Sequence, residues 1–297
     1  MNGNQFFAVQ IDYVVIATSI LCMLPVLLTV IVILRKANQR KAEKKHPFKE
    51  LRRRPAGESL RLKIESLNEQ INDKIMLLIS VPMGLACLTF VLRLHGLIAC
   101  LVLLTISLVW TLSLMPGFSR LVEDFRTYRL GFDGERYVGE ELTRLIAHGF
   151  EIYHDLPFDG FNMDHVLVGR SGVFVVETKT RRKPVNDSGD KEFKVLFNGT
   201  SLRWPWGEET KDVEQARNNA ATLSNWLTKA VGQSVKVSPI LTLPGWWIER
   251  TAPPENVRVL NPKEITRIHD SKGDALDPEM TRRICYQLDQ KCRMEIA

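Results

Sequence analysis

Three long apolar runs in the first 115 residues constrain the fold of this chain more than any other feature. They cover residues 13–34, 75–92 and 97–115, and none of them contains a charged side chain. A helix needs about 20 apolar residues to cross a bilayer core of about 30 Å. We therefore expect three transmembrane α-helices preceded by a short tail, 1–12. The alternative is a helical hairpin buried in a soluble core.

Positive charge is concentrated between the first two runs, where residues 35–74 contain 13 Lys and Arg. The positive-inside rule places this basic loop, which includes an amphipathic helical stripe from Leu60 to Ile71, in the cytoplasm. The N-terminus and the turn at 93–96 then lie outside, and residues 116–297 lie inside, as in a multi-pass plasma-membrane protein. Anionic lipid is the expected partner of the loop, at about 1 kcal/mol per basic residue. Nucleic acid is the alternative partner.

Residues 116–297 carry 26 Lys and Arg against 27 Asp and Glu, so their charge gives no argument for nucleic-acid binding. Helical and strand patterns alternate along them. Helices are predicted at 132–150, 212–227 and 277–295, and strands at 151–155, 164–168, 173–179, 193–197, 202–204, 236–243 and 257–260. This order predicts an α/β domain with a mixed central sheet flanked by helices.

The stretch "MDHVLVGRSGVFVVETKT", residues 163–180, reads as a β-hairpin around a Gly-Arg-Ser-Gly turn. Even pairing from that turn sets Asp164 opposite Glu177, with Cβ atoms about 5 Å apart and Lys179 on the same face. Two carboxylates placed opposite each other repel, and a Mg²⁺ ion between them would reverse that cost. Lys179 could then orient an attacking water or stabilise charge on a phosphate.

A second interpretation remains open: both carboxylates point into solvent at the end of the hairpin, and Lys179 neutralises them. Two other features also allow two interpretations. His165 points away from Asp164 and fits a core histidine better than a ligand. Trp204 and Trp206 could stack on bases, although a packing role suits them better.

The pieces "GFDGERYVGEEL", "NMDHVLVGRSGVFVVETKT" and "VEQARNNAATLSNWL" together resemble the nuclease-related (NERD) domain family, over residues 131–268. The resemblance implies a PD-(D/E)xK nuclease-like fold and Mg²⁺ (or Mn²⁺) as cofactor. It makes Asp164 and Glu177 metal ligands and Lys179 the catalytic lysine. By the same resemblance, Glu135 supports the metal from the first helix and Gln215 helps to hold the site.

Three basic residues, Arg181, Arg182 and Lys183, follow the lysine and could contact phosphates, or simply form a solvated loop. The resemblance implies DNA as substrate. We therefore expect a membrane-anchored, metal-dependent endonuclease-like protein that hydrolyses DNA phosphodiester bonds on the cytoplasmic side. The alternative is a non-catalytic, membrane-tethered module that binds nucleic acid or protein.

Overall fold

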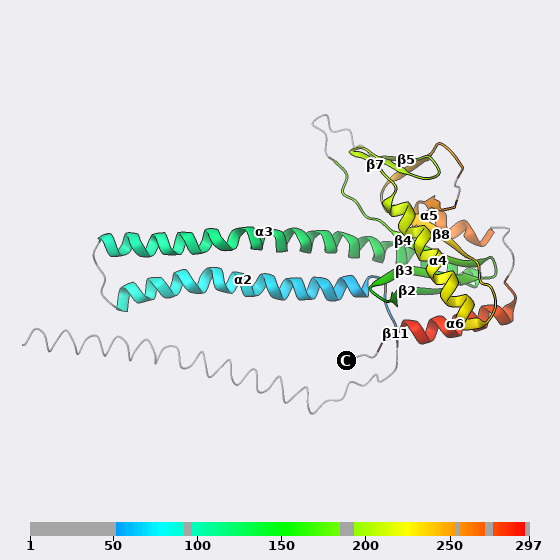
Figure 1. Cartoon of the computed structure of the whole chain (residues 1–297), viewed down its shortest axis with the longest axis horizontal. Coiled ribbons are helices and arrows are strands. Elements are labelled where there is room, and N and C mark those ends of the chain that lie inside the picture. Colours follow the sequence, from blue (N-terminus) through cyan, green and yellow to red (C-terminus); the bar gives the residue numbers. More distant parts are fainter. Residues whose placement is uncertain (1–51, 92–96, 185–192, 254–255, 271–275, 295–297) are drawn as a thin grey trace, which may run out of the picture. The chain divides into compact units, whose positions relative to one another are not determined.

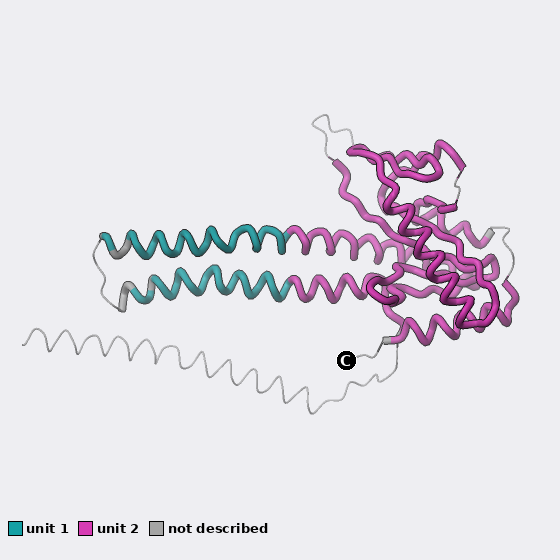
Figure 2. The backbone as a smooth tube through the Cα atoms, in the orientation of Figure 1, with its two compact units in different colours: residues 1–49, 68–122, 297 teal, residues 50–67, 123–296 magenta. Residues whose placement is uncertain are grey.

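The computed structural model describes residues 52–91, 97–184, 193–253, 256–270 and 276–294 (Figure 1). They divide between two compact units (Figure 2): residues 1–49, 68–122 and 297 form one, and residues 50–67 and 123–296 form the other. The expected span at 13–34 and most of the basic stretch before residue 52 lie outside the described residues.

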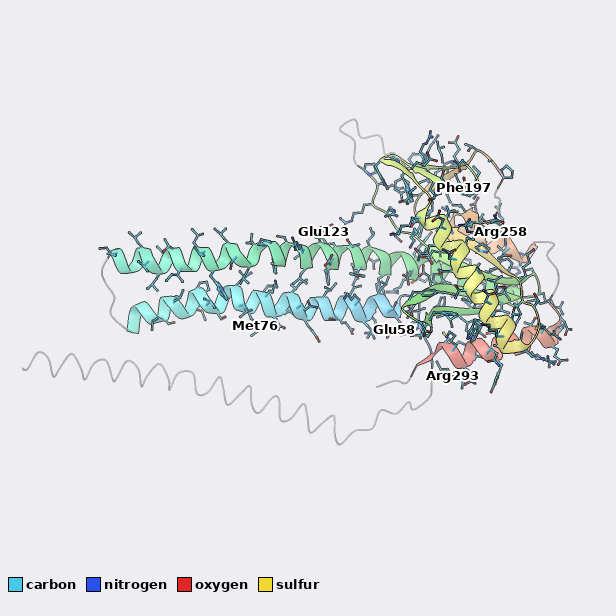
Figure 3. All side chains as sticks on the ribbon, viewed as in Figure 1. Glu58, Met76, Glu123, Phe197, Arg258 and Arg293 are labelled. Carbon is cyan, nitrogen blue, oxygen red and sulfur yellow. The ribbon has the colours of Figure 1, made fainter. Side chains whose placement is uncertain are left out.

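Two long helices pass through both units: α2 (Glu58–Val91) and α3 (Leu97–Leu142). Their segments in the first unit carry large apolar side chains that project outward, such as Met76 with 69% of its surface exposed (Figure 3). Ile98, at 78%, is more exposed still. Exposed apolar surface of this kind is typical of regions that contact lipid or another protein.

The search for membrane-spanning helices among the described residues finds one, in the helical stretch Leu101–His148. None of the most apolar part of this stretch is buried by protein. The expected span at 97–115 overlaps this helix. The expected span at 75–92 falls on α2, which does not meet the criterion in the described part of the chain. The structure therefore supports one candidate span and does not support the set of three.

The boundary expected between residue 115 and a helix near 132 is absent, because α3 continues unbroken from Leu97 to Leu142. Pro116 lies inside it, and its ring removes only one intrahelical hydrogen bond. Likewise, α2 begins at Glu58, so the second half of the expected basic loop is helix that leads directly into residues 75–91. The expected stripe is present there, with Leu67 only 4% exposed.

The second unit is built on a five-stranded mixed sheet, in the order β10-β8-β4-β3-β2. Strands β2, β3 and β4 form an antiparallel meander, β8 pairs with β4 in parallel, and β10 pairs with β8 in parallel. The mixed α/β fold expected from the sequence is thus confirmed. The strands are β2 (Glu151–Phe158), β3 (Phe161–Gly169), β4 (Gly172–Thr178), β8 (Val237–Thr242) and β10 (Arg258–Leu260).

Two apolar layers cover this sheet. On one face, α4 (Lys211–Val231) and α6 (Pro278–Cys292) pack on Val166, Val173 and Val175. On the other face, the end of α3 and the short helix η1 (Thr143–His148) pack on Leu167 and Phe174. The alternation of residues 173–176 between the two layers follows from the two-residue period of a strand, and both of its faces are buried.

A second, four-stranded sheet, in the order β7-β6-β5-β9, was not expected. It consists of β5 (Lys194–Phe197), β6 (Leu202–Trp204), β7 (Gly207–Glu209) and β9 (Trp247–Arg250). The prediction missed β7 and β9 because they are short and largely exposed, so they carry no apolar alternation. Two further pieces close the unit: β1 (Arg52–Arg53) pairs with β11 (Arg293–Met294), and α5 (Pro262–Ile265) leads into η2 (Thr266–Asp270).

Candidate functional site

The predicted hairpin register is present. Val168 pairs with Val173 and Val166 with Val175, and the ladder is recorded as far as His165 and Val176. One further step in the same register places Asp164 opposite Glu177. Beyond this point a side chain replaces the backbone as acceptor: Asp164 Oδ2 accepts a hydrogen bond from the backbone N–H of Thr178 at 2.7 Å. The site is therefore built where β3 and β4 stop pairing, with Asp164 on one strand and Glu177 on the other.

Glu177 is held by three donors rather than facing Asp164 alone. Lys179 Nζ lies 2.8 Å from its Oε1, Gln215 Nε2 donates to the same oxygen at 2.7 Å, and Asn219 Nδ2 donates to Oε2 at 2.8 Å. Only 3% of Glu177 is exposed, so these bonds compensate the burial of its charge. Gln215 and Asn219 are four residues apart on α4 and so lie on one helix face.

Asn219 was missed in the sequence, although its spacing from Gln215 could have revealed it. Glu177 is not an unpaired charge opposite Asp164: it is the acceptor at the centre of a hydrogen-bonded network. Lys179 shares the face of Glu177 as predicted, and it pairs with that carboxylate.

Glu135 reaches this region from α3. Its helix comes very close to the end of β4: a side chain at Gly134 would place Cβ only 1.7 Å from Thr180 Oγ1. Glycine at this position therefore allows the approach that brings the next residue, Glu135, to the site. Glu135 and Asp164 both line a surface cavity of about 460 Å³, together with Ser59, Asn162 and Phe161.

Asp155 is a further acidic neighbour of the site that the sequence did not reveal. Its backbone is left-handed, with φ 47°, and the β2–β3 register sets it opposite Asp164. Its carboxylate accepts hydrogen bonds from the Ser59 hydroxyl at 2.6 Å and N–H at 3.1 Å, and from Asn162 Nδ2 at 3.0 Å. Arg54 lies 3.4 Å away. The first turn of α2 is thus tied to the strand next to the site.

The acidic groups perturb one another's pKa. Burial, followed by the charges of Asp155 and Glu177, raises the pKa of Glu135 to about 8. Burial, followed by the charges of Glu177 and Glu135, raises the pKa of Asp164 well above its usual range. Burial also raises the pKa of Glu177, and Lys179 partly offsets this. Burial lowers the pKa of Lys179, but the charge and hydrogen bond of Glu177, together with the charges of Asp164 and Asp212, outweigh it, and the net shift is upward.

The three basic residues after Lys179 do not behave alike. Arg181 donates to Asp212 at 2.9 Å and to Glu209 at 3.0 Å, and its guanidinium lies 5.6 Å from the Trp204 ring centre. Its charge is therefore already compensated. Arg182 and Lys183 are exposed, and in the described part of the chain neither forms an ion pair. Their predicted contact with phosphates stays a prediction.

The packing interpretations fit the other two features. His165 is fully buried, and its Nδ1 lies 2.8 Å from His154 Nδ1. Trp204 is 2% exposed and stacks on Trp206, which is 53% exposed. Trp204 is thus a core side chain, and Trp206 covers it at the surface.

The donors of the site fit a magnesium ion held by two carboxylates. Glu177 raises the pKa of both Asp164 and Glu135, so the three carboxyl groups lie close together, and one lysine does not neutralise them. No group of three His, Cys, Asp or Glu side chains is placed to hold a metal within the described ranges. Mg²⁺ is commonly bound through one or two carboxylates, with water or substrate phosphate as its other ligands. Asp164 and Glu177 could supply such a pair.

Comparison with known protein families gives one match: the nuclease-related domain (NERD) matches residues 130–244. The match contains the meander, α4, β8 and every predicted site residue, and it confirms the resemblance over that part of the chain. It supports a nuclease-related function in general terms. Neither the comparison with curated proteins nor that with solved structures found a match.

Proposed function

We propose that this protein is a membrane-anchored, metal-dependent nuclease that hydrolyses phosphodiester bonds of DNA on the cytoplasmic side of the plasma membrane. One observation carries the proposal. The ion pair of buried Glu177 and half-buried Lys179 stands at the end of β4, beside Asp164 and Glu135, inside the segment that matches the nuclease-related domain. A buried acidic cluster with strongly shifted pKa values is a feature of functional sites more often than of structural ones.

Asp164 and Glu177 would hold Mg²⁺ (or Mn²⁺) in this proposal. When bound, the metal would activate a water and stabilise the negative charge that develops on the phosphate. The residues of the chain prepare the site. Gln215 and Asn219 fix the orientation of the Glu177 carboxylate. Lys179 favours its ionised form and would turn toward the phosphate when a substrate arrives.

Glu135 holds a proton at neutral pH, because its pKa is about 8 without a metal. A divalent cation nearby would lower that pKa, so metal binding near pH 7 should release a proton from this residue. Glu135 thus reports on metal binding without being one of the two metal ligands.

The proposed membrane anchor is the apolar part of α3 together with the two other runs, 13–34 and 75–92. The single candidate span supports the part of this anchor on α3, and the excess of Lys and Arg at 35–74 supports its orientation. With the N-terminus outside, the basic segment faces anionic lipid on the cytoplasmic side. DNA would meet the site there.

A second function also has an observation in its favour. Both oxygens of Glu177 already accept hydrogen bonds from protein donors, and a metal would have to compete with them. This geometry suits a non-catalytic module that keeps the nuclease fold and binds nucleic acid or protein. The two functions differ in whether divalent cations bind at Asp164 and Glu177.

The test uses the full chain in detergent micelles, with supercoiled plasmid DNA and either Mg²⁺, Mn²⁺ or EDTA. A nuclease should nick the plasmid only with a divalent cation, and Asp164→Asn and Lys179→Met should each abolish nicking. Calorimetric titration with Mn²⁺ should detect binding that Asp164→Asn weakens and Lys179→Met retains, since an ammonium group is not a metal ligand. Absence of both nicking and Mn²⁺ binding would reject the enzyme and favour the binding module.

A further inference from the structure

A second cavity lies on the other side of α4 from the candidate site. It has a volume of about 590 Å³ and is lined by α4 and by the starts of β8 and β10. Its lining includes three cationic side chains, Arg217, Lys236 and Arg258, as well as Ser238 and Asn256, and it includes no acidic residue. Charges of one sign gathered in a cavity focus the field and attract counter-ions.

Arg258 is the most unusual of the three (labelled in Figure 3). It is half-buried, and its guanidinium lies 5.2 Å from the ring centre of Phe174. Burial lowers its pKa, and no acidic side chain counters that shift. Among the described residues its guanidinium makes neither a hydrogen bond nor an ion pair. A guanidinium has five N–H donors, and partly burying them without an acceptor is costly.

Arg250, in the same unit, differs from Arg258 because its guanidinium has hydrogen-bond acceptors. It donates to the carbonyl of Val259 at 2.8 and 3.0 Å and forms an ion pair with Glu264 at 2.6 Å. Arg258, only eight positions away, has an aromatic ring beneath it and an open cavity in front. The ring supports one face of the guanidinium, and its N–H groups have no acceptor among the described residues.

This cavity is separate from the candidate nuclease site. Its wall includes Val237, which pairs with Val173 at the beginning of β4. Glu177 pairs with Leu241 toward the opposite end of the same two strands. On α4, the cavity uses Arg217 and Ser224, whereas Gln215 and Asn219 turn toward Glu177.

We propose that this cavity binds the phosphate group of a nucleotide-sized ligand. Three cations around one cavity suit a multiply charged anion better than a single carboxylate, and an arginine fork bonds two phosphate oxygens at once. A volume of 590 Å³ lies in the range of about 300–1,000 Å³ typical of small-molecule pockets, which exceeds the need of a phosphate ion alone. The Ser238 hydroxyl and the Asn256 amide add uncharged donors at its wall. The same phosphate chemistry is present in a free nucleotide and at a phosphorylated DNA end.

The experiment is calorimetric titration of the full chain in micelles, with EDTA so that no metal bridges a ligand to the candidate nuclease site. The probes are ATP, adenosine, inorganic phosphate and a short 5′-phosphorylated oligonucleotide. ATP or the oligonucleotide should bind and adenosine should not, and the tighter of the two identifies the source of the phosphate. Binding should weaken as KCl increases, because the contacts are charged.

Two variants test the assignment. Arg258→Gln should weaken binding at least tenfold, as expected when charge-assisted hydrogen bonds are lost. Lys236→Gln lies at an exposed position, should fold normally and should weaken binding severalfold. Lys229→Gln removes the same charge from an exposed position on α4 outside the cavity, and it should bind like the wild type.

The proposal is overturned if none of the phosphate compounds binds, or if Lys236→Gln and Lys229→Gln weaken binding equally. The result is independent of the proposed nuclease. Asp164→Asn should leave ATP binding unchanged even where it abolishes DNA cleavage, and failure of cleavage leaves the prediction for this cavity intact.

Discussion

Glu135→Gln should stabilise the metal-free protein, and the gain should grow with pH. Glu135 is 9% exposed, and its pKa is raised from 4.5 to about 8. A carboxyl group with a raised pKa holds its proton more tightly in the folded state than in the unfolded state. Folding therefore loses stability as pH rises from about 4.5 to about 8. Glutamine cannot ionise, so the variant escapes this loss.

The size of the effect follows from the two pKa values. The cost of keeping Glu135 buried is under about 1 kcal/mol at pH 5 and about 3 kcal/mol at pH 7, if the shift is taken in full. The variant should thus gain about 2–3 kcal/mol on the wild type between these two pH values. For a unit of this size the gain corresponds to about 5–10 °C in melting temperature.

The assay is thermal unfolding of the full chain in micelles, followed by tryptophan fluorescence at several pH values between 5 and 8 with EDTA. Glu140→Gln is the matched control, because Glu140 lies on the same helix with its side chain 70% exposed. A divalent cation should reduce the gap between wild type and variant at pH 7. A difference in melting temperature that is the same at pH 5 and pH 7.5 would refute the argument that burial and neighbouring acids shift Glu135.

Three further predictions concern the same region. Gly134→Ala should destabilise the second unit by about 1–3 kcal/mol, because the new Cβ would overlap Thr180, and Thr180→Ala should restore part of the loss. Urea unfolding measures both. Asp155→Ala should cost about 3–5 kcal/mol by leaving its buried partners unpaired, whereas Asp159→Ala, at an exposed position, should cost almost nothing in the same urea titration. Lys179→Met should make the melting temperature fall more steeply as pH rises from 5 to 8. Without the lysine, the carboxyl group of Glu177 loses its nearest positive charge, and its pKa rises further. A pH profile parallel to the wild type would show that the lysine does not hold the cluster together.

The parts of the fold that could be predicted are those with strong local patterns. The Gly-Arg-Ser-Gly turn and the valines on both sides fixed the hairpin register from Gly169 back to His165. The apolar face of α4 and the Asp-Pro start of α6 were equally local signals. Such patterns depend on residues a few positions apart, and a single sequence displays them directly.

The remaining features depend on contacts between distant residues. Nothing near Glu177 indicates that Asn219 donates to it across 42 positions, and nothing near Asp155 points to Ser59. The four-stranded sheet was missed because β5 pairs with β9, about 50 residues later, through strands with little apolar alternation. The continuity of α3 through Pro116 was missed because a proline usually ends a predicted helix.

The link between Asp155 and the start of α2 has a consequence for how the functional part of the chain is delimited. Residues 130–244 match the nuclease-related domain, yet the carboxylate opposite Asp164 takes two of its hydrogen bonds from Ser59 and faces Arg54. Any fragment that begins near residue 116 or 130 discards these donors and leaves a buried charge without its partners. A peptide covering residues 50–67 should therefore restore stability to such a fragment when added in trans. The smallest unit that contains the complete site is therefore discontinuous in the sequence. Deletion mapping from the N-terminus would identify the start of α2 as essential, although none of the proposed catalytic residues lies there.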